Sequence, residues 1–463
     1  MFSAPARTAC AASGPTVGYE GITVSHTVES PGSATGAASV PPSPLRTASW
    51  TRIRELFALD PTTVHLNTGT VGAMPYEVLD TVDRVTRQWT GGLLDVYRPA
   101  MFTEYRAFIG RTFGVDEDEI VICHNATEGV ARVIHGLDLH PGDEVVTTTH
   151  ECYSVLSNFN LLRNRHGIVM RTVIPPSGHD VRAEEIVELV EAAITPRTRV
   201  LSFAAITLFT GTMFPVRQLC ELAHRHGLTT VIDGALIPGM LDVNLRDYGA
   251  DFITCSGSKF QCGPLGTGLI YVRNKVVPES NPLPLPTFWP LISTWYPMMG
   301  SPPPRTTTEV ASYNMGDYLQ SAGSANLARG AALTRAFELW DDIGRDRIER
   351  YVMDLAEYAR GRLIDAFGEQ AMYSPGVDPR LRSPLIAFNP FRRPEDAWNI
   401  KKFITFVKRL ETEHRIWTRW TEFDVPGSPH QHYAARITTH LFNTRDEIDH
   451  SVRTMVRLAE EMS

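Results

Sequence analysis

The sequence has few cysteines, and they fall into no recognised pattern. Its six cysteines among 463 residues form no Cys-x-x-Cys pair and no cluster with the spacing of zinc ligands. This usage is typical neither of a disulfide-stabilised secreted protein nor of a structural zinc domain. It favours a reducing compartment, and we therefore expect a cytoplasmic protein.

Long apolar runs and basic blocks are also missing. No uninterrupted apolar run approaches the ~20 residues that a membrane helix needs. The chain carries 44 Lys and Arg against 52 Asp and Glu, and no basic block could follow a phosphate backbone. We therefore expect neither a membrane nor a nucleic acid as partner. Residues 1–45 are rich in Ala, Ser, Gly, Pro and Thr without the features of an export signal, which predicts a disordered tail.

An α/β pattern begins at about residue 119, where short β-branched apolar runs start to alternate with amphipathic stretches. The predicted strands are 119–123, 143–149, 168–174, 199–205, 229–233, 251–255 and 267–273, and the predicted helices are 127–137, 153–166, 183–194 and 215–227. Strands that are separated by helices need right-handed crossovers. The sequence therefore predicts a mostly parallel, doubly wound sheet.

The rest of the chain predicts a two-domain organisation. We expect a large α/β domain over 76–320 and a smaller C-terminal α+β domain over 321–463, onto which residues 46–75 fold back. The smaller domain is predicted to have helices at 324–341 and 344–367 and a strand at 384–388. Within the large domain, 278–304 holds nine prolines and several aromatic residues. Such a segment is typical of an ordered arm that covers a pocket or grips a partner subunit.

Reactive side chains follow several predicted strands, at the sheet edge where ligands collect in open α/β folds. Small and hydroxyl-bearing residues after 119–123 open a helix, which suits an anion. The others are His150, Cys152 and Tyr153 after 143–149, Thr207 after 199–205, Asp233 at the end of 229–233, and Lys259 after 251–255. Each alone has an ordinary explanation, such as a cap, a turn or a solvated charge. Together they offer an anion cradle, a flat ring, a carboxylate and a lysine.

Pyridoxal 5'-phosphate needs this whole set. It requires a lysine amine for its Schiff base, a carboxylate that keeps its pyridine nitrogen protonated, donors around its phosphate, and a flat partner for its ring. A partly desolvated pocket lowers the pKa of a lysine and so makes it nucleophilic. We therefore predict a pyridoxal phosphate site with Lys259 and Asp233 at its centre.

Five motifs resemble the class V aminotransferase family of fold-type I pyridoxal phosphate enzymes, and most of all its isopenicillin N epimerase-like group. They are "HLNTGTVGAMP" at 65–75, "NATEGV" at 125–130, "VIDGALIPG" at 231–239, "SGSKFQCGPLGTG" at 256–268 and "RITTHLFNTRDEID" at 436–449. The resemblance runs from about residue 50 to the C-terminus. It implies the fold-type I transferase fold, with a smaller C-terminal α+β domain, and an enzyme that acts on an amino acid.

The resemblance also implies roles for the matching residues. Lys259 would form the Schiff base, Asp233 would pair with the pyridine nitrogen, and His150 would stack on the ring as a second catalytic residue. The remaining cofactor contacts would come from Ala126, Thr127, Glu128, Thr207, Ser256 and Ser258. Arg436 would hold the substrate carboxylate, together with Arg419 and Asn67. Ser324 would reach the phosphate of a neighbouring subunit, which implies a homodimer with shared active sites.

The reaction is less specified than the cofactor. The resemblance favours epimerisation at the Cα of an amino acid or amino-acid conjugate, with Cys152, Tyr153 or a water as second acid. The alternatives are β-elimination by a C–S lyase, aminotransferase or decarboxylative chemistry, and a non-catalytic regulator. No cysteine follows Cys262, which disfavours desulfuration through a persulfide-forming cysteine. Aromatic and histidine side chains over 417–432 indicate either a large substrate or packing of the small domain.

Overall fold

The computed structural model describes residues 43–92, 99–273, 288–289, 319–320 and 326–463. The predicted tail lies outside these residues except for 43–45, and the predicted arm except for Phe288 and Trp289. Phe288 is fully buried, and the backbone N–H of Trp289 donates to the carbonyl of Gly136 over 2.6 Å. Ser324 also lies outside the described residues.

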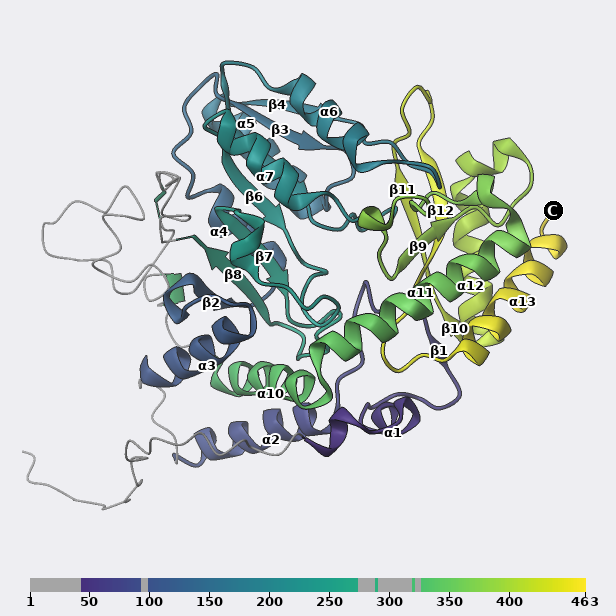
Figure 1. The fold of residues 1–463 in the computed structure, drawn as a ribbon, viewed down its shortest axis with the longest axis horizontal. Helices are drawn as coiled ribbons and strands as arrows, with labels where there is room; N and C mark the ends of the chain where they lie inside the picture. Colours follow the sequence, from purple (N-terminus) through teal and green to yellow (C-terminus); the bar gives the residue numbers. More distant parts are fainter. Residues whose placement is uncertain (1–42, 93–98, 274–287, 290–318, 321–325) are drawn as a thin grey trace, which may run out of the picture. The chain divides into compact units, whose positions relative to one another are not determined.

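A seven-stranded sheet contains all the strands predicted between residues 119 and 273, in the order β2-β8-β7-β6-β5-β3-β4 (Figure 1). The strands are β2 Ile120–Cys123, β3 Glu144–Thr148, β4 Val169–Val173, β5 Thr198–Ala204, β6 Thr229–Asp233, β7 Phe252–Ser256 and β8 Gly268–Val272. The neighbours from β4 to β7 pair in parallel, and β8 runs antiparallel to both β2 and β7. The predicted mostly parallel α/β fold is therefore confirmed.

Helices cover this sheet on both faces (Figure 1). They include α3 Pro99–Thr112, α4 Ala126–Ile134, α5 Tyr153–His166, α6 Ala183–Ala193 and α7 Val216–Arg225. Adjacent strand residues enter different cores: Leu201 packs in the core that includes α6 and α7 residues, and Val200 in the core that includes α4 and α5 residues. Strands buried on both faces must be apolar along their length, which explains the continuous apolar runs of the sequence.

A separate three-stranded antiparallel sheet forms in the C-terminal part, in the order β11-β12-β9. Its strands are β9 Leu385–Phe388, β11 Arg419–Phe423 and β12 His432–Thr438, and the nearby helices are α11 Arg345–Phe367, α12 Ile400–His414 and α13 Arg445–Glu461. The N-terminal segment contributes β1 Val64–His65, which pairs in parallel with β10 Ile416–Trp417. The division into two domains near residue 320 stays a prediction.

The remaining long helices are α2 Tyr76–Thr90 and α10 Leu327–Ile343, which pack against each other. Helix α1, Trp50–Arg54, contacts α11, where the ring of Trp50 stacks on Tyr351 with centroids 4.0 Å apart. None of the helices in the described residues is long and apolar enough to span a membrane.

Candidate active site

Lys259 lies in the short connection between β7 and β8. Because residues 257–267 contain no helix, the chain turns straight back and β8 runs antiparallel to β7. The carbonyl of Lys259 accepts the N–H of Cys262 over 3.0 Å, and a Cβ on Gly72 would come within 2.1 Å of that carbonyl. The loop that contains Gly72 therefore packs directly on the lysine backbone. Burial lowers the pKa of the Lys259 amine, an effect that Asp233 opposes.

Asp233 ends β6, the strand beside β7, and is only 8% exposed. Its Oδ1 accepts the N–H of Ala235 over 2.9 Å. Burial raises the pKa of this carboxyl, while the charge of Lys259 acts in the opposite direction. The structure thus brings together the amine and the carboxylate that the sequence predicts.

Arg436 is a buried cation on β12. Its side chain is held by the carbonyl of Leu208 at 2.8 Å, by Asn67 Oδ1 at 3.1 Å and by Thr70 Oγ1 at 2.9 Å. All three acceptors are neutral, and no ion pair forms with a carboxylate in the described residues. Burial lowers the pKa of Arg436 to about 9, and the charge of Arg419 adds to the effect. A buried cation without an acid is costly, so the site suits an incoming anion.

Arg419 lies directly opposite Arg436 in the β11–β12 pairing. Side chains at directly paired positions point to the same face of a sheet. Arg419 is exposed, whereas Arg436 is enclosed, so the two guanidinium groups stand at different depths on that face. The predicted pair of substrate arginines is therefore assembled by one antiparallel register.

The predicted phosphate side begins at α4. Its cap residue Asn125 accepts the N–H of Glu128 over 2.8 Å, and a Cβ on Gly268 would come within 2.7 Å of Asn125 Cα, so β8 packs closely against this helix start. On the neighbouring strand end, the hydroxyls of Ser256 and Ser258 lie 3.4 Å apart. Thr127 follows Ala126 in the first turn of α4. Helix amides and adjacent hydroxyls provide the donors that a phosphate requires.

Two predicted cofactor residues use their side chains locally. The carboxylate of Glu128 accepts both the backbone N–H of His124 and a hydrogen bond with its ring, each at 2.7 Å. Thr207 is fully buried, with its hydroxyl 2.7 Å from that of Thr210 and accepting the N–H of Thr212 over 3.1 Å. Their predicted contacts with the cofactor stay predictions.

His150 is held in place by contacts with the C-terminal part of the chain. It is fully buried, its Nε2 lies 2.8 Å from the carbonyl oxygen of Asp424, and its ring meets Phe423 edge-on with centroids 5.7 Å apart. Burial lowers the pKa of the imidazole. Its contacts thus attach the end of β3 to β11, and none of them is with Lys259 or Asp233. The stacking of His150 on a cofactor ring stays a prediction.

Glu151 and Cys152, which follow His150 in the chain, each interact electrostatically with a predicted cofactor residue. Cys152 is partly exposed, and its ionised form would raise the pKa of Lys259. Glu151 was not predicted as a site residue, yet its fully buried carboxyl feels the charge of Asp233. A signal was present, because Glu151 stands between two predicted residues in a run that follows a strand.

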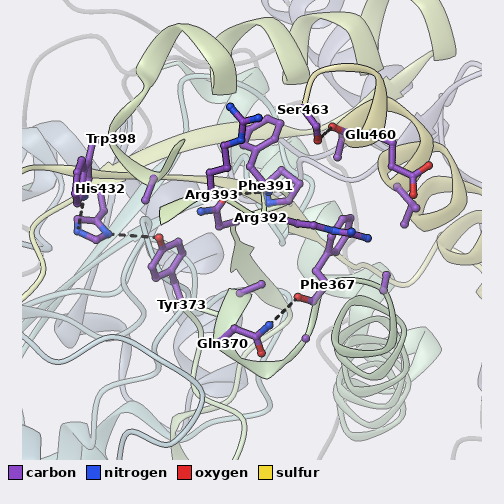
Figure 2. A pocket seen from close by; sticks show the side chains of 18 residues that line it. Phe367, Gln370, Tyr373, Phe391, Arg392, Arg393, Trp398, His432, Glu460 and Ser463 are labelled. Carbon is purple, nitrogen blue, oxygen red and sulfur yellow. Dashed lines mark hydrogen bonds between the residues drawn. The ribbon is translucent and has the colours of Figure 1, made fainter. Parts of the chain in front are cut away.

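The aromatic residues near the C-terminus divide between several places. Trp420 packs beside Tyr433 in the core of the small sheet, whereas Trp417 is exposed and borders a cavity of about 680 Å³ with His65. His432 instead lines a separate cavity of about 790 Å³ with Trp398, Arg392 and Arg393 (Figure 2). Its imidazole accepts the indole N–H of Trp398 over 3.2 Å and lies 3.4 Å from the hydroxyl of Tyr373. Lys259, Asp233 and Arg436 do not line that cavity.

The donor set fits pyridoxal phosphate. A helix start with two adjacent serines suits the phosphate, a buried carboxylate suits the pyridine nitrogen, and an amine of lowered pKa lies beside that carboxylate. The role of the buried Arg436 in holding a substrate carboxylate stays a prediction.

Known proteins resemble this chain over most of its length. Isopenicillin N epimerase from Amycolatopsis lactamdurans is 26% identical over 420 residues, covering 89% of this chain and 99% of the relative. The same-named protein from Streptomyces clavuligerus is 27% identical, covering 87% and 96%. A probable cysteine desulfurase from Halobacterium salinarum is 28% identical, covering 83% and 89%.

Solved structures share the fold. A cystine C–S lyase in complex with cysteine persulfide superposes with a TM-score of 0.68 at 20% identity, covering 86% of this chain and 98% of its own. A cysteine desulfurase from Thermococcus onnurineus gives 0.67 at 19% identity, covering 89% and 98%. The profile of the class-V aminotransferase family matches residues 94–390. The chain therefore belongs to the class-V aminotransferase family, whose members are pyridoxal-phosphate-dependent enzymes.

Proposed function

We propose that this enzyme epimerises the Cα of an amino acid or an amino-acid conjugate. Bound pyridoxal phosphate would act as an electron sink that makes the Cα proton acidic. In the proposal, Arg436 holds the α-carboxylate and Lys259 carries the proton on one face of the substrate. Asp233 is the partner for the pyridine nitrogen.

The observation that supports this proposal is a partly exposed thiol, Cys152, within electrostatic range of Lys259. An epimerase needs a second proton carrier for the face that the lysine does not serve. Cys152 is partly exposed and within electrostatic range of the lysine, whereas the hydroxyl of Tyr153 is already bonded to Glu422. Cys152 is thus better placed than Tyr153 for the second role. The near full-length likeness to isopenicillin N epimerases supports the same reaction.

Isotope exchange tests the reaction directly. The enzyme is incubated with candidate amino acids in heavy water, and we expect deuterium at Cα together with inverted configuration. Cys152→Ala should retain exchange but lose inversion, because the lysine can still remove and return a proton on its own face. Cys220→Ala, which changes a buried thiol in α7, is the matched control and should keep both. Exchange with full inversion in Cys152→Ala would remove Cys152 from the mechanism.

A β-eliminating C–S lyase is the second candidate. Cysteine desulfurases are among the relatives, and elimination needs no persulfide-forming cysteine of the kind that is missing after Cys262. Release of pyruvate and a thiol from a cysteine conjugate, without inversion at Cα, would favour this reaction over epimerisation.

The cofactor has its own test. The purified enzyme should show an absorbance band from pyridoxal phosphate bound to Lys259, and Lys259→Ala should abolish that band. A wild-type protein that stays colourless after cofactor is added would overturn the assignment.

A further inference from the structure

Glu151 is a fully enclosed acid at the end of β3. Its Oε1 accepts the hydroxyl of Thr148 over 2.6 Å, and its Oε2 is buried without a hydrogen-bond partner in the described residues. The backbone of Ala204 on β5, which pairs in register with Asp233, lies near the Glu151 carboxyl and lowers its pKa. Glu151 therefore occupies the layer of strand ends that contains Asp233, and no cation pairs with it there.

A buried carboxyl that feels the negative charge of a second carboxyl releases its proton less readily. Burial raises the pKa of Glu151 to about 8, and the charge of Asp233 contributes to the rise. The charge of Lys259 lowers the pKa of Asp233, whereas it is not among the causes that shift the pKa of Glu151. Because Asp233 has the nearby cation and a small exposed fraction, the negative charge is more stable there. The proton therefore stays on Glu151.

Among the described residues, no titratable group near Glu151 and Asp233 would move the proton from Glu151 to Asp233. The titratable groups around the pair are His150 and Cys152 beside Glu151 in the chain, Cys255 on β7, and Lys259 after β7. The pKa of His150 is lowered by burial, so its ring is neutral, and burial raises the pKa of Cys255 well above its usual value. Neither supplies a positive charge that would ionise Glu151.

We propose that Glu151 is a positioning residue that keeps its proton in the working enzyme and so leaves Asp233 as the one carboxylate available to the pyridine nitrogen. This inference rests on the proposed pairing of Asp233 with that nitrogen. A charged Glu151 would add a second negative charge near Asp233 and would raise the pKa of Asp233 further. A neutral Glu151 avoids this while still filling its buried space with a hydrogen-bonded side chain.

The proton can be detected in the full-length protein without cofactor. Infrared titration should show the carbonyl band of a protonated carboxylic acid at neutral pH, which disappears as the pH rises above about 8. Glu151→Gln should lack the band. Glu144→Gln is the matched control, because Glu144 is equally enclosed on β3 but is paired with Arg171 and Arg197, and it should keep the band. A band that survives in Glu151→Gln would overturn the proposal.

Cofactor binding provides the second readout. Glutamine is neutral and of the same shape, so below pH 7 Glu151→Gln should match the wild type in absorbance spectrum and, within about threefold, in affinity for pyridoxal phosphate. Above pH 9 the spectra should differ, because only the wild type gains a charge. A tenfold weaker affinity at pH 7 would show that the ionised carboxylate is required, and identical spectra at all pH values would show a purely structural role. If the wild type binds no cofactor, the proposed function fails, whereas the infrared result still stands or falls by itself.

Discussion

At the scale of single residues, two enclosed glutamates behave in opposite ways: Glu144 begins β3, and Glu151 lies three residues beyond its end. Glu144 is held by Arg171 at 2.6 Å and by Arg197 at 2.7 Å, and its pKa falls to about 2 chiefly through its hydrogen bond with Thr195. Glu151 has no cation, and burial raises its pKa to about 8. The same side chain near the two ends of one strand is therefore an anion in the first case and a neutral acid in the second.

This contrast predicts opposite effects of pH on stability. Between the unfolded pKa of about 4.5 and the folded pKa of about 8, folded Glu151 keeps a proton that the unfolded chain has released. Stability from this group is therefore lost as the pH rises, and Glu151→Gln should exceed the wild type at pH 8 by on the order of 3 kcal/mol more than at pH 5. Glu144→Gln should be destabilised at pH 7 and approach the wild type near pH 2. Denaturant unfolding of the cofactor-free chain at several pH values measures both effects.

His150 gives a second prediction at this scale. Because its ring bonds to Asp424 and packs on Phe423, His150→Ala should lower the free energy of unfolding by about 1 to 3 kcal/mol. If His150 stacks on the cofactor ring as the resemblance implies, the absorbance band of bound pyridoxal phosphate should shift and its affinity should fall. Cofactor titration of His150→Ala beside Cys152→Ala checks this. An unchanged spectrum and affinity in His150→Ala would contradict the ring-stacking role.

At the scale of elements, the site depends on loops that touch backbone to backbone. The N–H of Gly72 donates to the carbonyl of Ser258 over 2.9 Å, and a Cβ on Gly72 would also come within 2.7 Å of Cys262 Sγ. The N-terminal loop thereby fixes the turn that carries Lys259. A Cβ added at Gly72 could not move away from these atoms by side-chain rotation, because its position is fixed by the backbone.

Gly72→Ala should therefore displace the lysine turn. We expect at least a tenfold loss of affinity for pyridoxal phosphate, as measured by absorbance titration. Gly361→Ala, in the middle of α11, is the control, since nothing lies within 4 Å of its added Cβ. Alanine favours helix there and should raise stability by up to about 1 kcal/mol. Unchanged cofactor affinity in Gly72→Ala would mean that the two loops can separate without affecting the lysine.

Much of this arrangement could be predicted from the sequence. The predicted strand 229–233 matches β6 at both ends, and Asp233 and Lys259 follow adjacent strands because parallel strands place their carboxyl ends together. The side-chain directions after β3 could not be predicted. Once regular pairing ends, alternation no longer tells whether His150, Glu151 or Cys152 faces the pocket.

At the scale of the whole molecule, the resemblance predicts a homodimer in which Ser324 serves the partner's site. Sedimentation should give twice the mass of one chain. Lys259→Ala and Ser324→Ala chains should complement each other when they are mixed under exchange conditions, because one site of each heterodimer then has neither substitution. A monomeric enzyme with full activity would contradict the prediction.

The hydrogen bonds that hold Arg436 join parts of the chain that are synthesised far apart in time. Asn67 and Arg436 are separated by 369 positions, and the carbonyl of Leu66 accepts the N–H of Thr438 over 2.9 Å. The emerging polypeptide therefore has its lysine and its aspartate long before β12 can arrive. Contacts of such long sequence separation form slowly. A nascent chain that already contains Lys259 and Asp233 therefore lacks Arg436, the proposed holder of the substrate carboxylate, until β12 has been synthesised.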